Sequence, residues 1–104
     1  MKERPLETAL RLTHGDRHQE YGHPAEDFER TAGMWQALFG WDVDPKDVPL
    51  AMACVKLSRL RQSPEHTDSV VDLAGYAEAY SMVLDREHEQ DERKGEDGHS
   101  TVAR

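Results

Sequence analysis

The chain has 104 residues, of which 21 are acidic and 13 are Lys or Arg, so its formal net charge is -8. This length suits one domain rather than two. The acidic balance argues against a nucleic-acid binder, because such proteins neutralise phosphates with clustered Lys and Arg. No apolar run approaches the roughly 20 residues of a membrane span, and no signal-peptide pattern follows Met1. We therefore expect a cytoplasmic protein that does not contact membranes.

The first predicted helix covers residues 5–13, with Pro5 in its first turn. Gly15 is a suitable residue to end it. One face of this helix is expected to pack on the protein and carries Leu6, Ala9, Leu10 and Thr13. The polar segment that follows, residues 14–24, is expected to form a glycine-containing loop.

The second predicted helix begins near Pro24 and stops at Gly40. Its apolar side chains recur at helical spacing and predict a core-facing stripe of Phe28, Ala32, Trp35 and Phe39. The third helix begins at Asp44 or Asp47 and continues through Leu60. Its apolar residues lie on more than one face, which is typical of a helix buried on several sides.

The single cysteine, Cys54, lies in an apolar part of that third helix. One cysteine can form neither an internal disulfide nor a cysteine-based zinc site. We therefore expect Cys54 to be a small buried hydrophobic side chain.

The fourth predicted helix begins between Pro64 and Thr67 and ends near Arg86. Residues 87–104 are almost entirely polar, so we expect a frayed helix end and a loose tail there, outside a single helical domain of residues 1–86. No segment shows the alternation of a strand. The predicted fold is all-α, a four-helix bundle-like domain. Its excess of apolar surface predicts a homo-oligomer, most simply a dimer.

Two aspartates on the fourth helix, Asp68 and Asp72, are four residues apart and share a face. Carboxylates beside apolar residues require a cation. Mg²⁺ is one candidate, because it takes carboxylate oxygens and substrate phosphates as ligands. The alternative is that Asp68 is a first-turn helix acid and Asp72 pairs with Lys or Arg.

The third helix offers such cations in Lys56 and Arg59, which are neighbours on the helix surface. They can pair with the aspartates in an ion network or bind phosphate oxygens, for which Arg provides a bidentate fork and Lys a point charge. The residues alone leave both alternatives open.

The segment before the second helix contains Arg17, Tyr21, Gly22 and His23 and leads into a helix N-terminus, which favours anions. Tyr21 offers a face for stacking on a base. An ordinary helix connection, with Gly22 at positive φ, explains the same residues. In the second helix, Glu26 and Glu29 form either a further carboxylate pair or two solvated helix acids.

Three blocks of sequence occur in a recognisable order: residues 15–24 (GDRHQEYGHP), residues 56–59 (KLSR) and residues 68–76 (DSVVDLAGY). Over residues 6–84 the chain resembles a family of small helical bacteriophage proteins, common in phages of actinobacteria. That family is similar to the nucleotide-modification-associated domains of phages, and more remotely to the MazG-like all-α NTP pyrophosphohydrolases.

The resemblance implies a site for a nucleotide and Mg²⁺. MazG-like enzymes bind Mg²⁺ through an ExxE and an ExxD pair on bundle helices and release pyrophosphate from nucleoside triphosphates. Glu26 and Glu29 match the first spacing, whereas Asp68 and Asp72 form DxxxD and depart from the second.

The roles implied by this resemblance fall into two groups. The metal ligands are Asp68, Asp72, Glu26 and Glu29. The ligand-binding residues are Arg17, Tyr21, Gly22, His23, Lys56, Arg59 and Tyr76, among which Lys56 and Arg59 stabilise phosphate charge and Tyr21 stacks on the base, with Trp35 and Tyr76 as alternatives. In the catalytic case Asp68, Asp72, Lys56 and Arg59 carry the reaction.

Three functions follow from these observations. The first is Mg²⁺-dependent hydrolysis of a nucleoside triphosphate or related phosphate ester. The second is a non-catalytic module that binds or sequesters a nucleotide. The third is a structural or interaction protein in which the charged residues form only an internal ion network.

Overall fold

The structure, a computed structural model, describes the backbone of residues 3–98 and the side chains of residues 3–93. This part of the chain forms the five helices α1 (Pro5–His14), α2 (Asp16–Tyr21), α3 (Pro24–Phe39), α4 (Asp47–Gln62) and α5 (Thr67–Gly98). Residues 3–98 contain no strand. The predicted all-α fold class is confirmed. None of the described helices is both long and apolar enough to cross a membrane.

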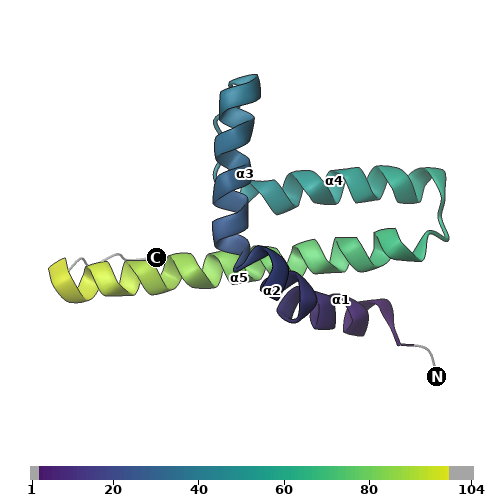
Figure 1. Cartoon of the computed structure of the whole chain (residues 1–104), viewed down its shortest axis with the longest axis horizontal. Helices are drawn as coiled ribbons and strands as arrows, with labels where there is room; N and C mark the ends of the chain where they lie inside the picture. Colours follow the sequence, from purple (N-terminus) through teal and green to yellow (C-terminus); the bar gives the residue numbers. More distant parts are fainter. Residues whose placement is uncertain (1–2, 99–104) are drawn as a thin grey trace.

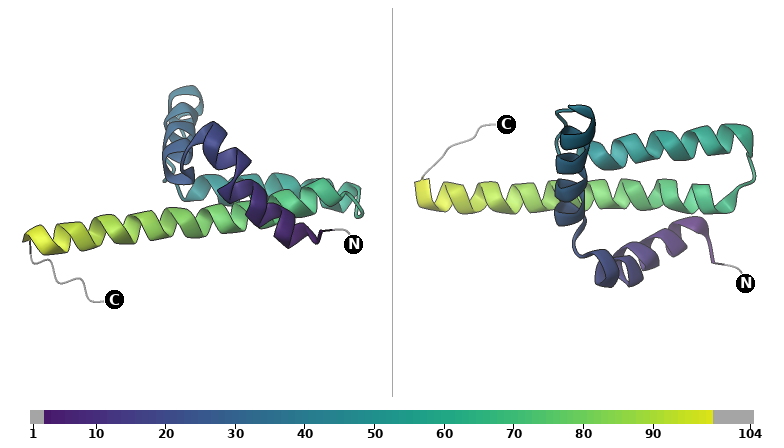
Figure 2. Two further views of the ribbon diagram at one scale, coloured as in Figure 1. Left: turned by 60° about the horizontal axis from the view of Figure 1, so that its bottom comes forward. Right: turned by 45° about the horizontal axis from the view of Figure 1, so that its top comes forward.

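The long helix α5 is the wall against which the other long helices pack (Figure 1). Helix α4 runs antiparallel along one side of α5, and α1 packs obliquely on the opposite side without touching α4 (Figure 2). Helix α3 crosses α4 and α5 at a steep angle. The radius of gyration is 16.1 Å, against about 13 Å for a compact domain of 100 residues. The bundle-like arrangement is therefore open.

The hydrophobic core lies where α3 crosses α4 and α5. It consists of the buried residues Phe28, Ala32, Val48, Ala79 and Val83, with Trp35, Met52 and Tyr76 packed at its edge. The stripe predicted on α3 is therefore only half correct. Phe39 at its end is 57% exposed and stacks on the equally exposed Trp41, with ring centroids 4.5 Å apart.

The segment between the first two predicted helices is not a simple loop, because Asp16–Tyr21 forms α2. Gly15 separates α1 from α2, and Gly22, at φ 80°, turns the chain into α3. Helix α2 buries none of its residues. A short helix that lies on the surface carries no apolar stripe, so its polar sequence is the same as that of a loop.

The start of α4 decides between the two predicted positions, and the end of α5 differs from the predicted one. Helix α4 begins at Asp47, whose carboxylate accepts the N–H of Asp44 at 3.1 Å. Helix α5 begins at Thr67 and continues past Arg86 to Gly98. Opposite charges four residues apart, such as Glu89 and Arg93, favour helix even where no core is available. Of the frayed helix end and tail expected over residues 87–104, residues 87–98 belong to α5, and residues 99–104 lie outside the described residues.

Several apolar side chains that were expected to be buried are exposed. Leu6 and Leu10 on α1 are 62% and 42% exposed, whereas Ala9 and Thr13 beside them are buried. On α4, Leu57 is 53% exposed and Cys54 is exposed as well. The prediction that Cys54 is buried is wrong, because only one side of α4 packs against other helices of the chain.

His23 precedes α3 and caps it. Its Nδ1 accepts the N–H of Ala25 at 3.0 Å, which satisfies a helix N–H that has no partner within the helix. Burial lowers the pKa of His23 below its ordinary value of 6.5, and the nearby charges of Arg86 and His18 lower it further. The ring is therefore neutral near pH 7 and able to accept this hydrogen bond.

We expect His23→Ala to lower the free energy of unfolding by about 1 kcal/mol, because the Ala25 N–H loses its acceptor. His23→Asn should retain most of the stability. Because the folded state lowers the pKa of His23, its contribution is complete above pH 6.5 and is lost as the pH falls from 6.5 through the folded pKa. Urea unfolding at pH 7.5 and pH 5.5 measures both effects. A His23→Asn variant with the same pH dependence as the wild type would contradict this assignment.

Candidate functional site

The candidate site is organised around Asp72 in the middle of α5. Its Oδ2 accepts a hydrogen bond from the Lys56 Nζ of α4 at 3.0 Å. Its Oδ1 accepts one from the Arg17 Nη2 of α2 at 3.2 Å. One carboxylate therefore ties together three helices, α2, α4 and α5.

Lys56 is the most deeply buried member of this triad, since only 11% of its side chain is exposed, against 21% for Asp72 and 45% for Arg17. A lysine with so little access to water requires a partner for its charge. The side of α4 that carries Lys56 also carries Val48 and Met52, which lie two turns and one turn earlier, and this side packs against α3 and α5.

Arg17 reaches Asp72 across a gap that the helices themselves do not close. The α2 backbone packs against α1 and α3 rather than against α5, so the long Arg17 side chain makes the connection. Gly75 lies one turn after Asp72, and a Cβ atom there would stand 3.5 Å from the Thr13 hydroxyl and 4.0 Å from the Arg17 guanidinium.

The two cations determine the charge state of Asp72. Burial raises the pKa of the Asp72 carboxyl, but the hydrogen bonds from Lys56 and Arg17 outweigh burial, so its pKa lies below the ordinary value of 3.8. Asp72 is thus ionised at neutral pH. The triad, with two cations and one anion, has a net charge of +1.

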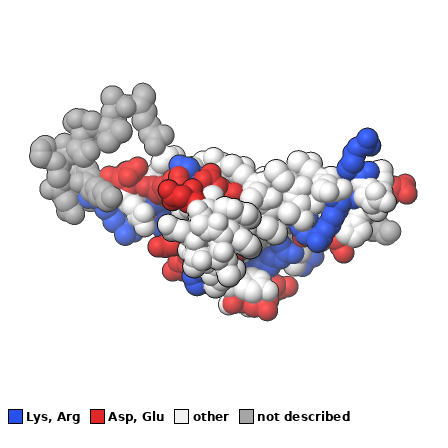
Figure 3. Space-filling view, turned by 90° about the horizontal axis from the view of Figure 1, so that it is seen from above, with Lys and Arg blue, Asp and Glu red and all other residues white. Residues whose placement is uncertain are grey.

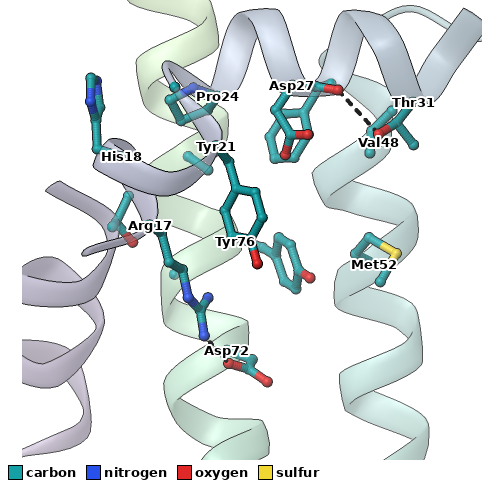
Figure 4. A pocket seen from close by; sticks show the side chains of 15 residues that line it. Arg17, His18, Tyr21, Pro24, Asp27, Thr31, Val48, Met52, Asp72 and Tyr76 are labelled. Atoms are coloured by element: carbon teal, nitrogen blue, oxygen red, sulfur yellow. Dashed lines mark hydrogen bonds and ion pairs between the residues drawn. The ribbon is translucent and has the colours of Figure 1, made fainter. Parts of the chain in front are cut away.

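A pocket of about 410 Å³ opens beside the triad and is bounded by residues of all five helices. Its volume lies within the range of small-molecule sites. Figure 4 shows Arg17 pointing toward Asp72 at one edge of the pocket, with Tyr21 and Tyr76 next to them. The lining is completed by the apolar residues Pro24, Phe28, Val48, Met52 and Ala79, the polar residues Thr13, His18, Asp27 and Thr31, and two glycines, Gly22 and Gly75.

The sequence analysis located part of this lining. Of the ligand-binding residues that it proposed, Arg17, Tyr21, Gly22 and Tyr76 line the pocket, and so does Asp72. Lys56 does not line it, and its ammonium is engaged in the ion pair with Asp72. His23 is engaged in capping α3.

The remaining proposed residues lie elsewhere. Arg59, Asp68, Glu26 and Glu29 are all exposed and do not line the pocket. Asp68 and Asp72 are one turn apart in α5, so they share a face of the helix, but Asp68 lies in the first turn of α5, away from the pocket. Among the described residues, no group of three or more His, Cys, Asp or Glu side chains is arranged to hold a metal ion.

Asp27 and Thr31 are lining residues that the sequence analysis missed. They stand four apart on α3, and the Thr31 hydroxyl donates to the backbone oxygen of Asp27 at 3.1 Å. Their spacing, together with Phe28 between them, places them on the core side of the helix. The signal available in the sequence was this polar pair, which lies on the helix face that also carries the apolar stripe.

The comparisons with known proteins identify the family. A family model described as a domain of unknown function, DUF6378, matches residues 4–84, and the chain belongs to this family. The chain is similar to the Gene 55 protein of Mycobacterium phage D29, with 34% identity over 94 residues that cover 90% of this chain and 62% of that protein. It is also similar to the Gene 55 protein of Mycobacterium phage L5, with 41% identity over 73 residues that cover 69% of this chain and 47% of that protein.

The predicted resemblance to a family of phage proteins is confirmed by these matches. The chain spans about half to three fifths of the length of the two relatives. No solved structure matches the chain.

We expect Asp72→Ala to lower the free energy of unfolding by about 3 kcal/mol, because it leaves the buried Lys56 ammonium without a partner. The double variant Asp72→Ala/Lys56→Met should recover to within about 1 kcal/mol of the wild type, since no buried charge remains. Arg17→Met, which removes the more exposed cation, should cost less than about 1 kcal/mol. Chemical denaturation of the wild type, these variants and the single variant Lys56→Met completes the double-mutant cycle and gives the coupling energy. A loss in the double variant equal to the sum of the losses in Asp72→Ala and Lys56→Met would show that Asp72 and Lys56 are energetically independent.

Proposed function

We propose that this member of the DUF6378 family is a nucleotide-binding protein and that its nucleotide occupies the pocket beside Asp72. The observation that carries the proposal is the combination, in one pocket, of an apolar floor, two tyrosine rings and an oriented guanidinium. These are the parts that a planar base joined to an anionic phosphate requires.

The apolar half of the pocket suits the base. Phe28, Val48 and Ala79 form a buried floor. Tyr21 is 53% exposed, so its ring has a free face on which a base can stack. The Asp27 carboxylate and the Thr31 hydroxyl lie on either side of Phe28 in the sequence of α3 and also line the pocket. They offer hydrogen bonds to the edge of a base.

The phosphate is assigned to the end of the pocket that holds Arg17. Asp72 engages one nitrogen of the Arg17 guanidinium and thereby orients it, and the other N–H groups are available as donors. Because the Lys56 ammonium neutralises the Asp72 carboxylate, the Arg17 guanidinium keeps an effective positive charge toward the pocket. A charge-assisted contact between Arg and phosphate is stronger than a neutral hydrogen bond.

Binding is better supported than hydrolysis. The pocket contains two carboxylates, Asp27 and Asp72, and Asp72 already accepts from two cations. The other proposed metal ligands, Asp68, Glu26 and Glu29, do not line it. This donor set does not fit a protein-held Mg²⁺ site within the described part of one chain. Hydrolysis by a MazG-like mechanism is therefore the alternative, and the assay for released pyrophosphate separates it from binding.

We expect nucleoside phosphates to raise the melting temperature of the protein, because a ligand that prefers the native state stabilises it. Nucleosides and inorganic phosphate should act more weakly, since each lacks half of the contacts. Arg17→Met should weaken binding by roughly tenfold and Tyr21→Ala by roughly three- to tenfold. A thermal-shift panel with and without Mg²⁺, followed by calorimetry on the best ligand, measures these effects.

Arg11→Met is the matched control, because Arg11 is an exposed arginine of α1 that pairs with Glu3 and does not line the pocket. It should bind as the wild type does. A folded protein that shows no shift with any nucleotide at millimolar concentration would contradict the proposal and favour the interaction-protein alternative. Mg²⁺-dependent release of pyrophosphate would show instead that the protein hydrolyses nucleoside triphosphates.

A further inference from the structure

The side of α4 that faces away from α5 is an uncharged surface with no partner in the described chain. It comprises six exposed residues, and we call it the outer face of α4: Leu50, Ala51, Cys54, Val55, Leu57 and Ser58. Leu50 and Leu57 are half exposed, at 50% and 53%. Figure 3 looks down on this side and shows uncharged side chains over α4, with charged ones beyond them.

Five of the six residues of the outer face, all except Val55, form a pattern that is symmetric about Cys54. Counting along α4, apolar or small residues lie three and four positions to either side of Cys54, and a charged residue lies seven positions to either side. The residue seven positions before is Asp47, and the residue seven positions after is Arg61. Offsets of three, four and seven return to the same side of a helix, so this whole set lies along one stripe.

We propose that the outer face of α4 binds the outer face of α4 in a second copy of this chain, antiparallel, with the two-fold axis at Cys54. In that arrangement each residue faces the one at the mirrored offset, as a two-fold interface requires. Arg61 of one copy meets Asp47 of the other, at both ends. The leucines at Leu50 and Leu57 lie opposite small partners, Ser58 and Ala51, and such alternation lets two helices pack closely.

The charge of this face suits a contact between two copies of the chain. The chain carries a net charge of -8, so two copies repel each other in most orientations. No acidic residue occurs between Asp47 and Glu65, a stretch that includes the entire outer face. A second copy can therefore approach here without facing carboxylates across the centre of the contact. The antiparallel direction also pairs opposite ends of the helix dipoles.

The proposed contact leaves the nucleotide pocket free and does not depend on the proposed function. The pocket is lined by Val48 and Met52, which lie on the side of α4 that packs against other helices of the chain. Residue by residue, the outer face and the pocket do not overlap. Failure of nucleotide binding would leave the dimer untouched, and the reverse also holds.

The first experiment is the mass of the full chain in solution by light scattering across a concentration series. We expect a dimer for the wild type and a dimer dissociation constant raised by roughly 100-fold or more for Leu57→Glu, which places a charge in the apolar contact. Leu6→Glu is the matched control, because Leu6 is an exposed leucine of α1 at 62%, and it should remain dimeric. Circular dichroism checks that both variants keep their helices. A wild type that is monomeric at all concentrations, or Leu6→Glu and Leu57→Glu with equal effects, would overturn the proposal.

Cysteine cross-linking tests the position of the axis. Cys54 is the single cysteine of the chain, so any disulfide joins two copies, and a residue on the axis meets its own equivalent within disulfide range. Mild oxidation should link the wild type but not Leu57→Glu at the same concentration. With Cys54→Ser as background, Ser58→Cys should not link, whereas Leu50→Cys together with Ser58→Cys should. Linking through Ser58→Cys alone would indicate a parallel contact and overturn the antiparallel assignment.

Discussion

The ion pair between Lys56 and Asp72 constrains the rest of the molecule, because a buried lysine cannot be left without a counter-charge. It fixes the register of α4 on α5 and holds the Asp72 carboxylate in place. The second oxygen of that carboxylate then orients Arg17, whose helix α2 has no backbone packing against α5. The part of the pocket formed by α2 is thus held in place through Asp72 by a lysine that does not itself line the pocket.

Helix α4 serves two surfaces with one amino-acid sequence. Its inner side supplies Val48 and Met52 to the core and the pocket, together with the Lys56 ammonium under the site. Its outer side is equally apolar, and this explains why the helix lacks a clear polar face. The described part of one chain covers only the inner side. The proposed contact with a second copy accounts for both the apolar character and the symmetric pattern of the outer side.

The sequence was sufficient for the features that depend on local chemistry. Prolines, glycines and helical periodicity located the four long helices and most of their ends, and the spacing from Asp68 to Asp72 correctly placed both on one face. It did not tell which cation meets which carboxylate, because Lys56 and Arg59 differ only in how α4 is rotated against α5. Helix α2 was missed because a helix that buries nothing has no periodic pattern. The exposure of Cys54 and Leu57 was missed for the opposite reason, since an apolar residue indicates burial whether its partner is in the same chain or another.

Because α1, α3 and α4 all pack against α5, the sequence distance from each of them to α5 also favours an order of folding. Helices α4 and α5 are adjacent in sequence and make the most extensive contact in the structure, so closing their hairpin costs little chain entropy. The contact of α1 with α5 joins segments separated by α2, α3 and α4, and its loop-closure cost is larger. This order favours a nascent chain that builds the Lys56–Asp72 side first and receives α1 and α2 last. The mouth of the pocket, which needs Arg17 and Tyr21, is then the last part of the described fold to form.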